Sequence, residues 1–114
     1  MGYRSQIAVA IKQEVYQNFL KGKNEGDNEK IISLIQSTDK MSNLHGDILL
    51  YWESIKWYPG YPDVDAFMLS LNSLNHEDYY FIELGEDVED TTIQGSWWDN
   101  PFELTINRSI NMCI

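Results

Sequence analysis

Lysine and arginine are absent from a long part of this chain. Residues 57–107 contain eleven aspartates and glutamates and no lysine or arginine, whereas residues 1–56 contain seven acidic and seven basic side chains. Residues 57–107 therefore carry eleven negative charges, and Arg108 brings the net charge of the 114 residues to −10. Proteins bind nucleic acid phosphates through Lys and Arg, so the absence argues against direct binding of DNA or RNA. A basic protein partner is the natural complement of such a surface.

Cysteine and long apolar runs are also scarce. The single cysteine, Cys113, has no second cysteine with which to form an internal disulfide, and the sequence places no base beside it, so we expect it to be chemically inert. The sequence has no run of about 18 apolar residues that could span a membrane. Its first residues also lack the pattern of a secretory signal. We therefore expect a soluble, cytoplasmic protein with no membrane partner.

The residues that are present suffice for one folded domain. Hydrophobic residues make up 43% and aromatic residues 13% of the chain, which favours a single domain over residues 1–114. Alternating and β-branched stretches predict strands at 3–12, 47–58, 79–84, 91–97 and 102–110. Helical spacing predicts a helix at 12–21, a second helix capped by Asp27 or Asn28 and followed by a polar loop at 36–43, and a third at 63–74. The order β-α-α-β-α-β-β-β indicates an α+β fold, with a mostly antiparallel sheet of four to five strands and two or three helices on one face.

The first predicted strand has one bulky and one small face. Ile7, Val9 and Ile11 alternate with Ala8 and Ala10 in "IAVAI". Successive side chains of a strand point to opposite faces of the sheet. We expect the alanine face to lie beneath a helix, because small side chains allow close approach.

The stretch "IELGEDVEDTTIQG", residues 82–95, concentrates five carboxylates between two predicted strands. They are Glu83, Glu86, Asp87, Glu89 and Asp90. Three interpretations are open: a metal site, an ordinary solvated hairpin, and a surface that contacts a basic partner. Glu83 lies within the predicted strand, and the other four lie in the turn.

Neither metal binding nor catalysis has a clear signature. A calcium loop of the EF-hand type needs a central glycine, and Thr91 and Thr92 stand in that part of the stretch. The candidate zinc ligands His45, His76 and Cys113 have no paired spacing. Carboxylates that share one exposed turn do not resemble a glycosidase pair, and no phosphate loop or nucleophile motif is present. We expect no cofactor and no enzymatic activity.

Aromatic residues beside turns are the other candidate contacts. Trp57 and Tyr61 flank the "PG" turn, and Trp97 and Trp98 are adjacent. Adjacent strand residues face opposite ways, so we expect one of these two tryptophans to cover the edge of the core or to anchor an interface. The predicted partner-binding residues are Glu86, Asp87, Glu89, Asp90, Asp99, Trp98, Trp57 and Tyr61.

Two stretches resemble an uncharacterised family of small proteins encoded by bacteriophages and prophages. Members of that family commonly start Met-Gly-Tyr-Arg-Ser and end with an Ile-Gly-Glu-Asp-like turn and an Arg-Ser-Ile-like strand. The matching residues here are Gly2, Tyr3, Arg4, Ser5, Gly85, Glu86, Asp87, Arg108, Ser109 and Ile110. Leu84 stands where isoleucine is more usual. The resemblance implies a phage-encoded accessory protein, a class rich in inhibitors of host defence.

These observations lead to one expected function and two alternatives. We expect an acidic binding protein, similar in action to an anti-CRISPR or another anti-defence protein, that occupies the basic, nucleic-acid-binding surface of a host nuclease or effector. One alternative is an immunity protein that neutralises a basic toxin. The other is a phage structural or assembly accessory protein, in which the aromatic turns form the contacts.

Overall fold

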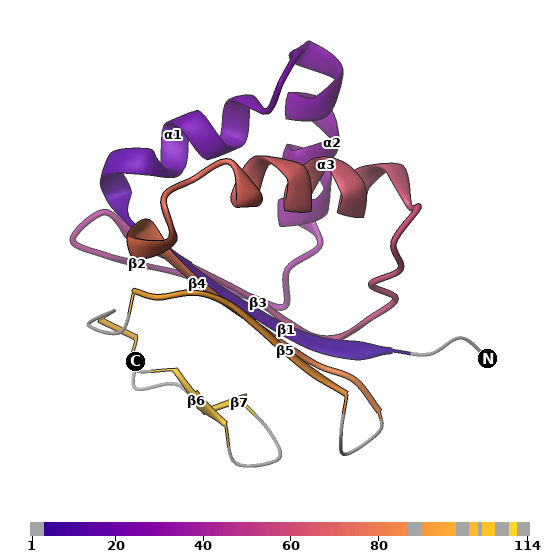
Figure 1. Cartoon of the computed structure of the whole chain (residues 1–114), viewed down its shortest axis with the longest axis vertical. Helices are drawn as coiled ribbons and strands as arrows, with labels where there is room; N and C mark the ends of the chain where they lie inside the picture. Colours follow the sequence, from indigo (N-terminus) through magenta and orange to yellow (C-terminus); the bar gives the residue numbers. More distant parts are fainter. Residues whose placement is uncertain (1–3, 87–89, 98–100, 103, 107–109, 112–114) are drawn as a thin grey trace.

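The computed structural model describes residues 4–86, 90–97, 101–102, 104–106 and 110–111. Its elements are β1 (Ser5–Ile11), α1 (Gln13–Lys21), α2 (Glu25–Gln36), β2 (Lys40–Leu44), β3 (Asp47–Ile55), α3 (Pro62–Asn72), a short 3-10 helix (His76–Asp78), β4 (Tyr79–Leu84), β5 (Thr91–Gly95), β6 (Thr105–Ile106) and β7 (Ile110–Asn111). The three helices lie together on one side of a twisted sheet (Figure 1). The predicted α+β fold is therefore confirmed.

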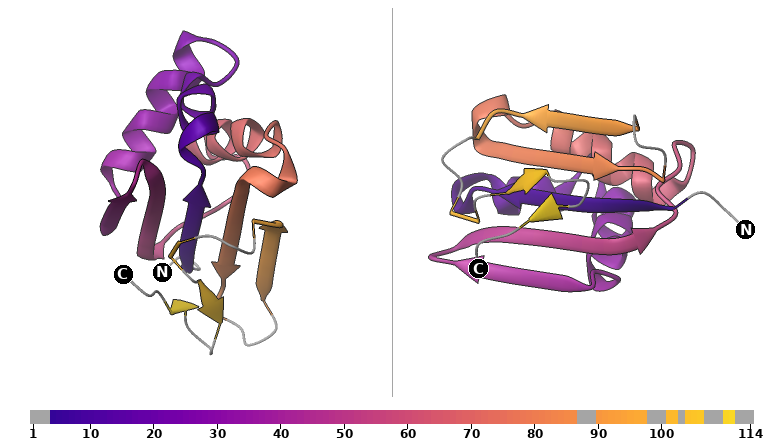
Figure 2. Two further views of the ribbon diagram at one scale, coloured as in Figure 1. Left: turned by 90° about the vertical axis from the view of Figure 1, so that its left-hand side faces the viewer. Right: turned by 90° about the horizontal axis from the view of Figure 1, so that it is seen from below.

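The main sheet has five strands in the order β2-β3-β1-β4-β5, and every neighbouring pair is antiparallel. The predicted sheet of four to five antiparallel strands, with helices on one face, is confirmed (Figure 2). β1 is central, and it pairs with both β3 and β4. The acidic part of the chain supplies β4 and β5, so it forms one whole edge of the sheet. The opposite edge is β2.

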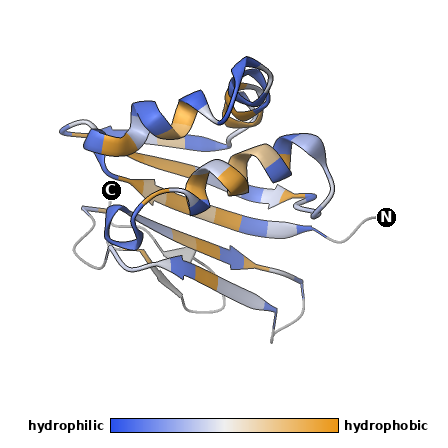
Figure 3. Cartoon of the chain, turned by 45° about the horizontal axis from the view of Figure 1, so that its top comes forward, coloured by the Kyte–Doolittle hydropathy of each residue, from blue (hydrophilic) through white to orange (hydrophobic). Residues whose placement is uncertain are grey.

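The bulky face of β1 packs against the helices. Ile7, Val9 and Ile11 have no exposed surface, and they share a core with Phe19 of α1 and Phe67 of α3. Figure 3 shows hydrophobic residues along the central strands beneath the helices. Burial of these large apolar side chains is the main stabilising contribution of this layer.

The small face of β1 does not lie beneath a helix, so this part of the sequence prediction was wrong. Ala8 and Ala10 instead share a second core with Trp97, Phe102 and Leu104 from the C-terminal segment. That segment crosses the sheet face opposite the helices (Figure 2). The alanines leave room for large side chains contributed by an irregular segment, whereas the helices pack against the isoleucine and valine side chains.

Gly95 lets the chain leave β5 and reach this second core. Its φ is +82°, and a Cβ at this position would lie 2.3 Å from the carbonyl oxygen of Tyr79. The turn directs Trp97 into the core, where 8% of its surface remains exposed. Trp98 lies outside the described residues, so the prediction that one of the two tryptophans covers the edge of the core or anchors an interface stays a prediction.

β2 was predicted to be part of a polar loop, and it is instead an edge strand. It pairs with β3 from Lys40 opposite Tyr51 to Leu44 opposite Asp47. His45 and Gly46 connect the two strands with positive φ angles of 56° and 93°, as a tight hairpin turn requires. Most β2 side chains are exposed, so the strand has no apolar alternation in its sequence.

The start of α2 also differs from the prediction. The N-cap of α2 is Asn24, whose side-chain oxygen accepts a hydrogen bond of 2.9 Å from the backbone nitrogen of Asp27. The predicted cap Asn28 lies inside the helix, where its side chain donates to the carbonyl of Leu20. In contrast, α3 begins at Pro62, one residue before the predicted start at 63, and proline suits the first turn of a helix.

The predicted single strand at 102–110 was wrong. Thr105 pairs with Asn111 and Ile106 pairs with Ile110, so β6 and β7 form a separate two-stranded antiparallel sheet. The sequence of this segment is compatible with extended backbone throughout, but local pairing folds it back on itself. Cys113 lies outside the described residues.

Candidate functional site

The acidic stretch is divided between two environments by the β4–β5 hairpin. Glu83 pairs with Ile7 of β1 and with Thr92 of β5, so its side chain faces the helix layer. Glu86 and Asp90 follow and precede the strands, and both are exposed. The predicted contact residues Asp87 and Glu89 lie between them, outside the described residues.

The turn itself is closed near the sheet. The backbone nitrogen of Gly85 donates to the carbonyl of Asp90 over 2.7 Å. Directly before the adjacent strand β1, the backbone nitrogen of Arg4 donates to Oε1 of Glu86 over 3.3 Å. The Arg4 guanidinium is directed elsewhere, because it donates to the Ser54 side chain and carbonyl over 2.8 and 2.7 Å. These bonds hold the two ends of the acidic turn at one end of the sheet.

Glu83 occupies a different setting from the turn carboxylates. It is half-buried, and Oγ of Ser5 donates a hydrogen bond of 3.3 Å to its Oε2. Burial raises the pKa of Glu83, the nearby Asp90 carboxylate raises it further, and the hydrogen bond from Ser5 partly offsets these effects. The folded protein thus keeps a carboxyl group where ionisation is disfavoured.

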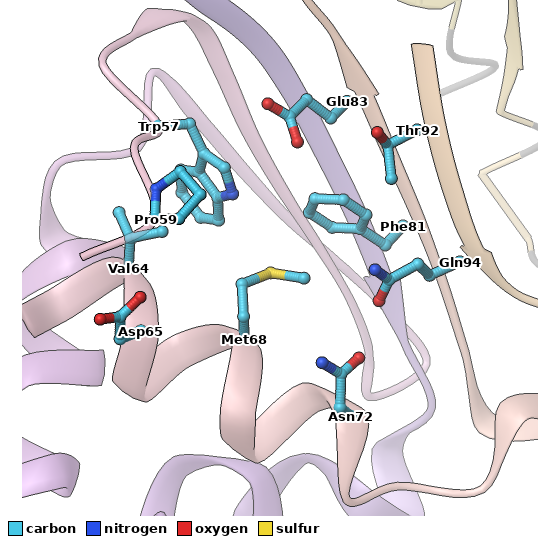
Figure 4. A pocket seen from close by; sticks show the side chains of 10 residues that line it. All are labelled: Trp57, Pro59, Val64, Asp65, Met68, Asn72, Phe81, Glu83, Thr92 and Gln94. Carbon is cyan, nitrogen blue, oxygen red and sulfur yellow. The ribbon is translucent and has the colours of Figure 1, made fainter. Parts of the chain in front are cut away.

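Glu83 lines a pocket between α3 and the β4–β5 edge (Figure 4). The pocket has a volume of about 280 Å³. Its lining combines an apolar wall with polar side chains from three elements: Trp57, Pro59, Val64, Asp65, Met68, Asn72, Phe81, Glu83, Thr92 and Gln94. A concave apolar site with a few convergent polar groups is the usual form of a ligand pocket in proteins.

Gln94 is the most unusual residue of this pocket. Its Oε1 is buried and has no hydrogen-bond partner. Gln94 pairs with Phe81 of β4, which directs its side chain to the same face as the core. Buried polar atoms are nearly always hydrogen-bonded in folded proteins, so this oxygen is an acceptor available to a ligand that carries a donor.

Trp57 was predicted to contact a partner, and the structure places it in the core instead. Only 5% of its surface is exposed. Its ring lies 5.3 Å from that of Trp52, 5.4 Å from that of Phe67 and 6.2 Å from that of Phe81, measured between ring centroids. β3 ends at Ile55, three residues before the predicted end, and this lets Trp57 turn inward. Trp57 therefore serves as a pocket wall and not as an exposed anchor.

The other predicted aromatic contact has the expected exposure. Tyr61 is 41% exposed, and its ring packs beside that of Tyr58 with centroids 5.2 Å apart. It directly precedes α3, on the same loop as Trp57. The remaining predicted contacts, Trp98 and Asp99, lie outside the described residues.

The sequence patterns did not predict the pocket. The strand period places Glu83 and Phe81 on one face, and the pairing of β4 with β5 adds Thr92 and Gln94 to that face. The shared face of these four residues follows from the sequence once the pairing of β4 with β5 is known. The position of α3 over the edge, which supplies Asp65, depends on tertiary packing.

Within the described ranges, no group of three or more His, Cys, Asp or Glu side chains is arranged to hold a metal ion. Across the same residues, no helix is long and apolar enough to cross a membrane. Protein-family models, curated proteins and solved structures give no match to this chain. Function is therefore inferred from the geometry of the β4–β5 edge.

Proposed function

We propose that this protein binds a basic protein partner through the end of the molecule that carries the β4–β5 turn. The observation that carries the proposal is the exposure of Glu86 and Asp90 at this turn. Asp65 and Glu83 line the same pocket, so the start of α3 and the end of β4 are adjacent (Figure 4). A carboxylate of α3 and a carboxylate of β4 thus line one pocket.

The charge of this end suits a nucleic-acid-binding partner. Surfaces that bind DNA or RNA are rich in Lys and Arg, and carboxylates fixed on a packed hairpin present negative charge to them as phosphates do. Complementary charge chiefly accelerates association and suppresses wrong partners. The protein acts by occupying the surface on which the partner would otherwise hold nucleic acid.

The resemblance to phage-encoded proteins supports a partner in the bacterial host. A defence nuclease or effector, such as a CRISPR effector, has a basic nucleic-acid channel and is a target that a phage gains from blocking. The protein would then work in the host cytoplasm as a stoichiometric inhibitor, without catalysis.

The test is capture from a bacterial lysate with two matched baits. One is the wild-type protein, and the other is a turn variant in which four carboxylates are neutralised: Glu86→Gln, Asp87→Asn, Glu89→Gln and Asp90→Asn. We expect a basic nucleic-acid-binding protein to be retained by the wild type at about 50 mM salt, released at about 500 mM, and lost from the turn variant.

A control bait carries the same change of net charge on α1 and α2. This helix variant has the substitutions Glu14→Gln, Glu25→Gln, Asp27→Asn and Glu29→Gln, and we expect it to retain the partner. Added wild-type protein should then displace DNA or RNA from the purified partner. Equal retention by the turn and helix variants, or unchanged nucleic acid binding by the partner, would refute the proposal. A captured toxin would identify the immunity protein alternative instead.

A further inference from the structure

The pocket between α3 and β5 contains more hydrogen-bonding capacity than the fold uses. Gln94 has a buried oxygen with no partner, and Glu83 receives one hydrogen bond of 3.3 Å from Ser5. Asp65 also lines the pocket, and its Oδ1 accepts from the backbone nitrogen of Gly60. These acceptors come from β5, β4 and α3 and surround one cavity.

The opposite side of the cavity is apolar and aromatic. Trp57 and Phe81 are almost wholly buried, and their remaining surface forms the wall together with Met68 and Val64. In Figure 4 the carboxylate of Glu83 lies above the aromatic rings, while Asp65 lies on the helix side of the cavity. A ligand in this space would contact rings on one side and carboxylates on two others.

We propose that this pocket binds a guanidinium group, supplied by the side chain of an arginine. A guanidinium is planar, stacks on aromatic rings, and presents donors along its whole edge, so it can contact Trp57 and donate to Glu83 and Gln94 together. Its charge matches the two carboxylates. The volume of about 280 Å³ is enough for the end of one side chain.

Other ligand classes fit the lining less well. A neutral ligand would leave two carboxylates uncompensated, and an anion would be repelled by them. A metal ion requires several oxygen ligands at short distance, and the apolar wall supplies none. A lysine ammonium is compact and strongly hydrated, so it would gain less from the aromatic wall than a guanidinium gains.

The source of the guanidinium rests on the proposed function, in which a basic partner supplies the arginine. Binding of a free guanidinium compound does not depend on that partner. The two ideas can therefore fail separately: the pocket can bind the group when no partner exists, and a partner can bind the acidic turn when the pocket binds nothing.

The test is a nuclear magnetic resonance titration of the ¹⁵N-labelled protein with N-acetyl-L-arginine amide. We expect saturable shifts of the Trp57 indole and the Gln94 side-chain amide, at ligand concentrations of about 1–20 mM that suit a small, weakly bound group. The matched probe is N-acetyl-L-citrulline amide, which has the same shape without the charge, and we expect no saturable shifts with it. Shifts of equal size with both probes would overturn the proposal.

Two variants and a control assign the binding to the pocket. Glu83→Gln should weaken the binding of the arginine probe about tenfold, because a charge-assisted hydrogen bond becomes a neutral one. Gln94→Leu should also weaken it, and should raise the melting temperature because a buried acceptor with no partner is removed. Glu25→Gln changes an exposed carboxylate on α2, outside both the pocket and the acidic turn, and should leave the affinity unchanged.

The remaining outcomes also decide the proposal. The proposal would be overturned if Glu83→Gln and Gln94→Leu, both folded by their spectra, bound the arginine probe with unchanged affinity. It would also be overturned if the arginine probe caused no chemical shift changes in the wild type. A basic peptide distinguishes the sources: replacing its single arginine by citrulline should abolish the Trp57 shift. A peptide that shifts only residues near Glu86 and Asp90 would support the acidic turn and contradict the pocket.

Discussion

Glu83 and Glu86 are three positions apart in the sequence and belong to two different regions of the molecule. Glu83 is half-buried in the pocket, facing α3, and burial raises its pKa. Glu86 is exposed at the turn, held by the backbone of Arg4. The comparison shows that a run of carboxylates in the sequence is not one surface, because the strand period turns Glu83 inward whereas Glu86 and Asp90 are exposed at the turn.

The two regions suit different parts of a binding event. Exposed charge on the turn acts over several ångströms and accelerates encounter. The pocket acts at contact, where buried groups fix one side chain and slow dissociation. Perturbing each region separately should therefore give distinguishable effects on stability, pH dependence and binding rates.

The largest expected effect concerns the core that forms the pocket wall. Trp57→Ala should lower the free energy of unfolding by about 3–5 kcal/mol, because it removes a buried ring that contacts Trp52, Phe67 and Phe81. Urea unfolding followed by circular dichroism measures this loss. The turn variant should unfold at the same urea concentration as the wild type, or at a slightly higher one, because like charges on the turn repel.

Tyr61→Ala is the matched control for this measurement. Tyr61 lies four residues after Trp57, and 41% of its surface is exposed, so its loss should cost no more than about 1 kcal/mol. Equal destabilisation by the two substitutions would contradict the placement of Trp57 in the core.

A smaller effect is expected in the pH dependence of stability. The pKa of Glu83 is raised above its usual 4.5 in the folded protein. The folded state therefore binds a proton more readily than the unfolded chain, so stability falls as the pH rises from about 4 through the folded pKa. Glu83→Gln removes this penalty, and its melting temperature should exceed that of the wild type by roughly 1–3 °C at neutral pH.

The difference in melting temperature between Glu83→Gln and the wild type should disappear at low pH. Below about pH 4, both the folded and unfolded wild type carry a protonated Glu83, so the two proteins should melt together. Thr92→Val, a substitution in the same pocket that removes no ionisable group, is the control, and its difference from the wild type should not change with pH. A Glu83→Gln advantage that grows as the pH falls would contradict the burial of this carboxyl group.

Strong local patterns in the sequence predicted much of the sheet and one helix boundary. The stretch "YYFIEL" became β4 over Tyr79–Leu84, and Pro62 begins α3 as turn chemistry indicates. β2 was missed because an edge strand whose side chains are mostly exposed needs no apolar alternation, as exposed Met41 and Leu44 illustrate. The pairing of β6 with β7 was missed because it depends on a local reversal within an otherwise extended segment.

The site was predictable only in part. The exposure of Glu86 and Asp90 agrees with their position in a polar turn, and it required no tertiary information. The burial of Trp57 and the pocket required the packing of α3 against the β4–β5 edge, which brings Asp65 and Gln94 to one cavity from distant positions in the chain. A sequence pattern describes each strand or helix, and it carries little information about the space between them.

The central claim is that the acidic turn steers this protein to a basic partner, and binding kinetics test it most directly. The association rates of the wild type, the turn variant and the helix variant with the captured partner would be measured at about 50 and about 500 mM salt, between which the Debye length falls roughly threefold. We predict that the turn variant associates about tenfold more slowly than the wild type at low salt, that the difference shrinks at high salt, and that the helix variant stays close to the wild type. Equal association rates for the turn variant and the wild type at both salt concentrations would contradict the claim.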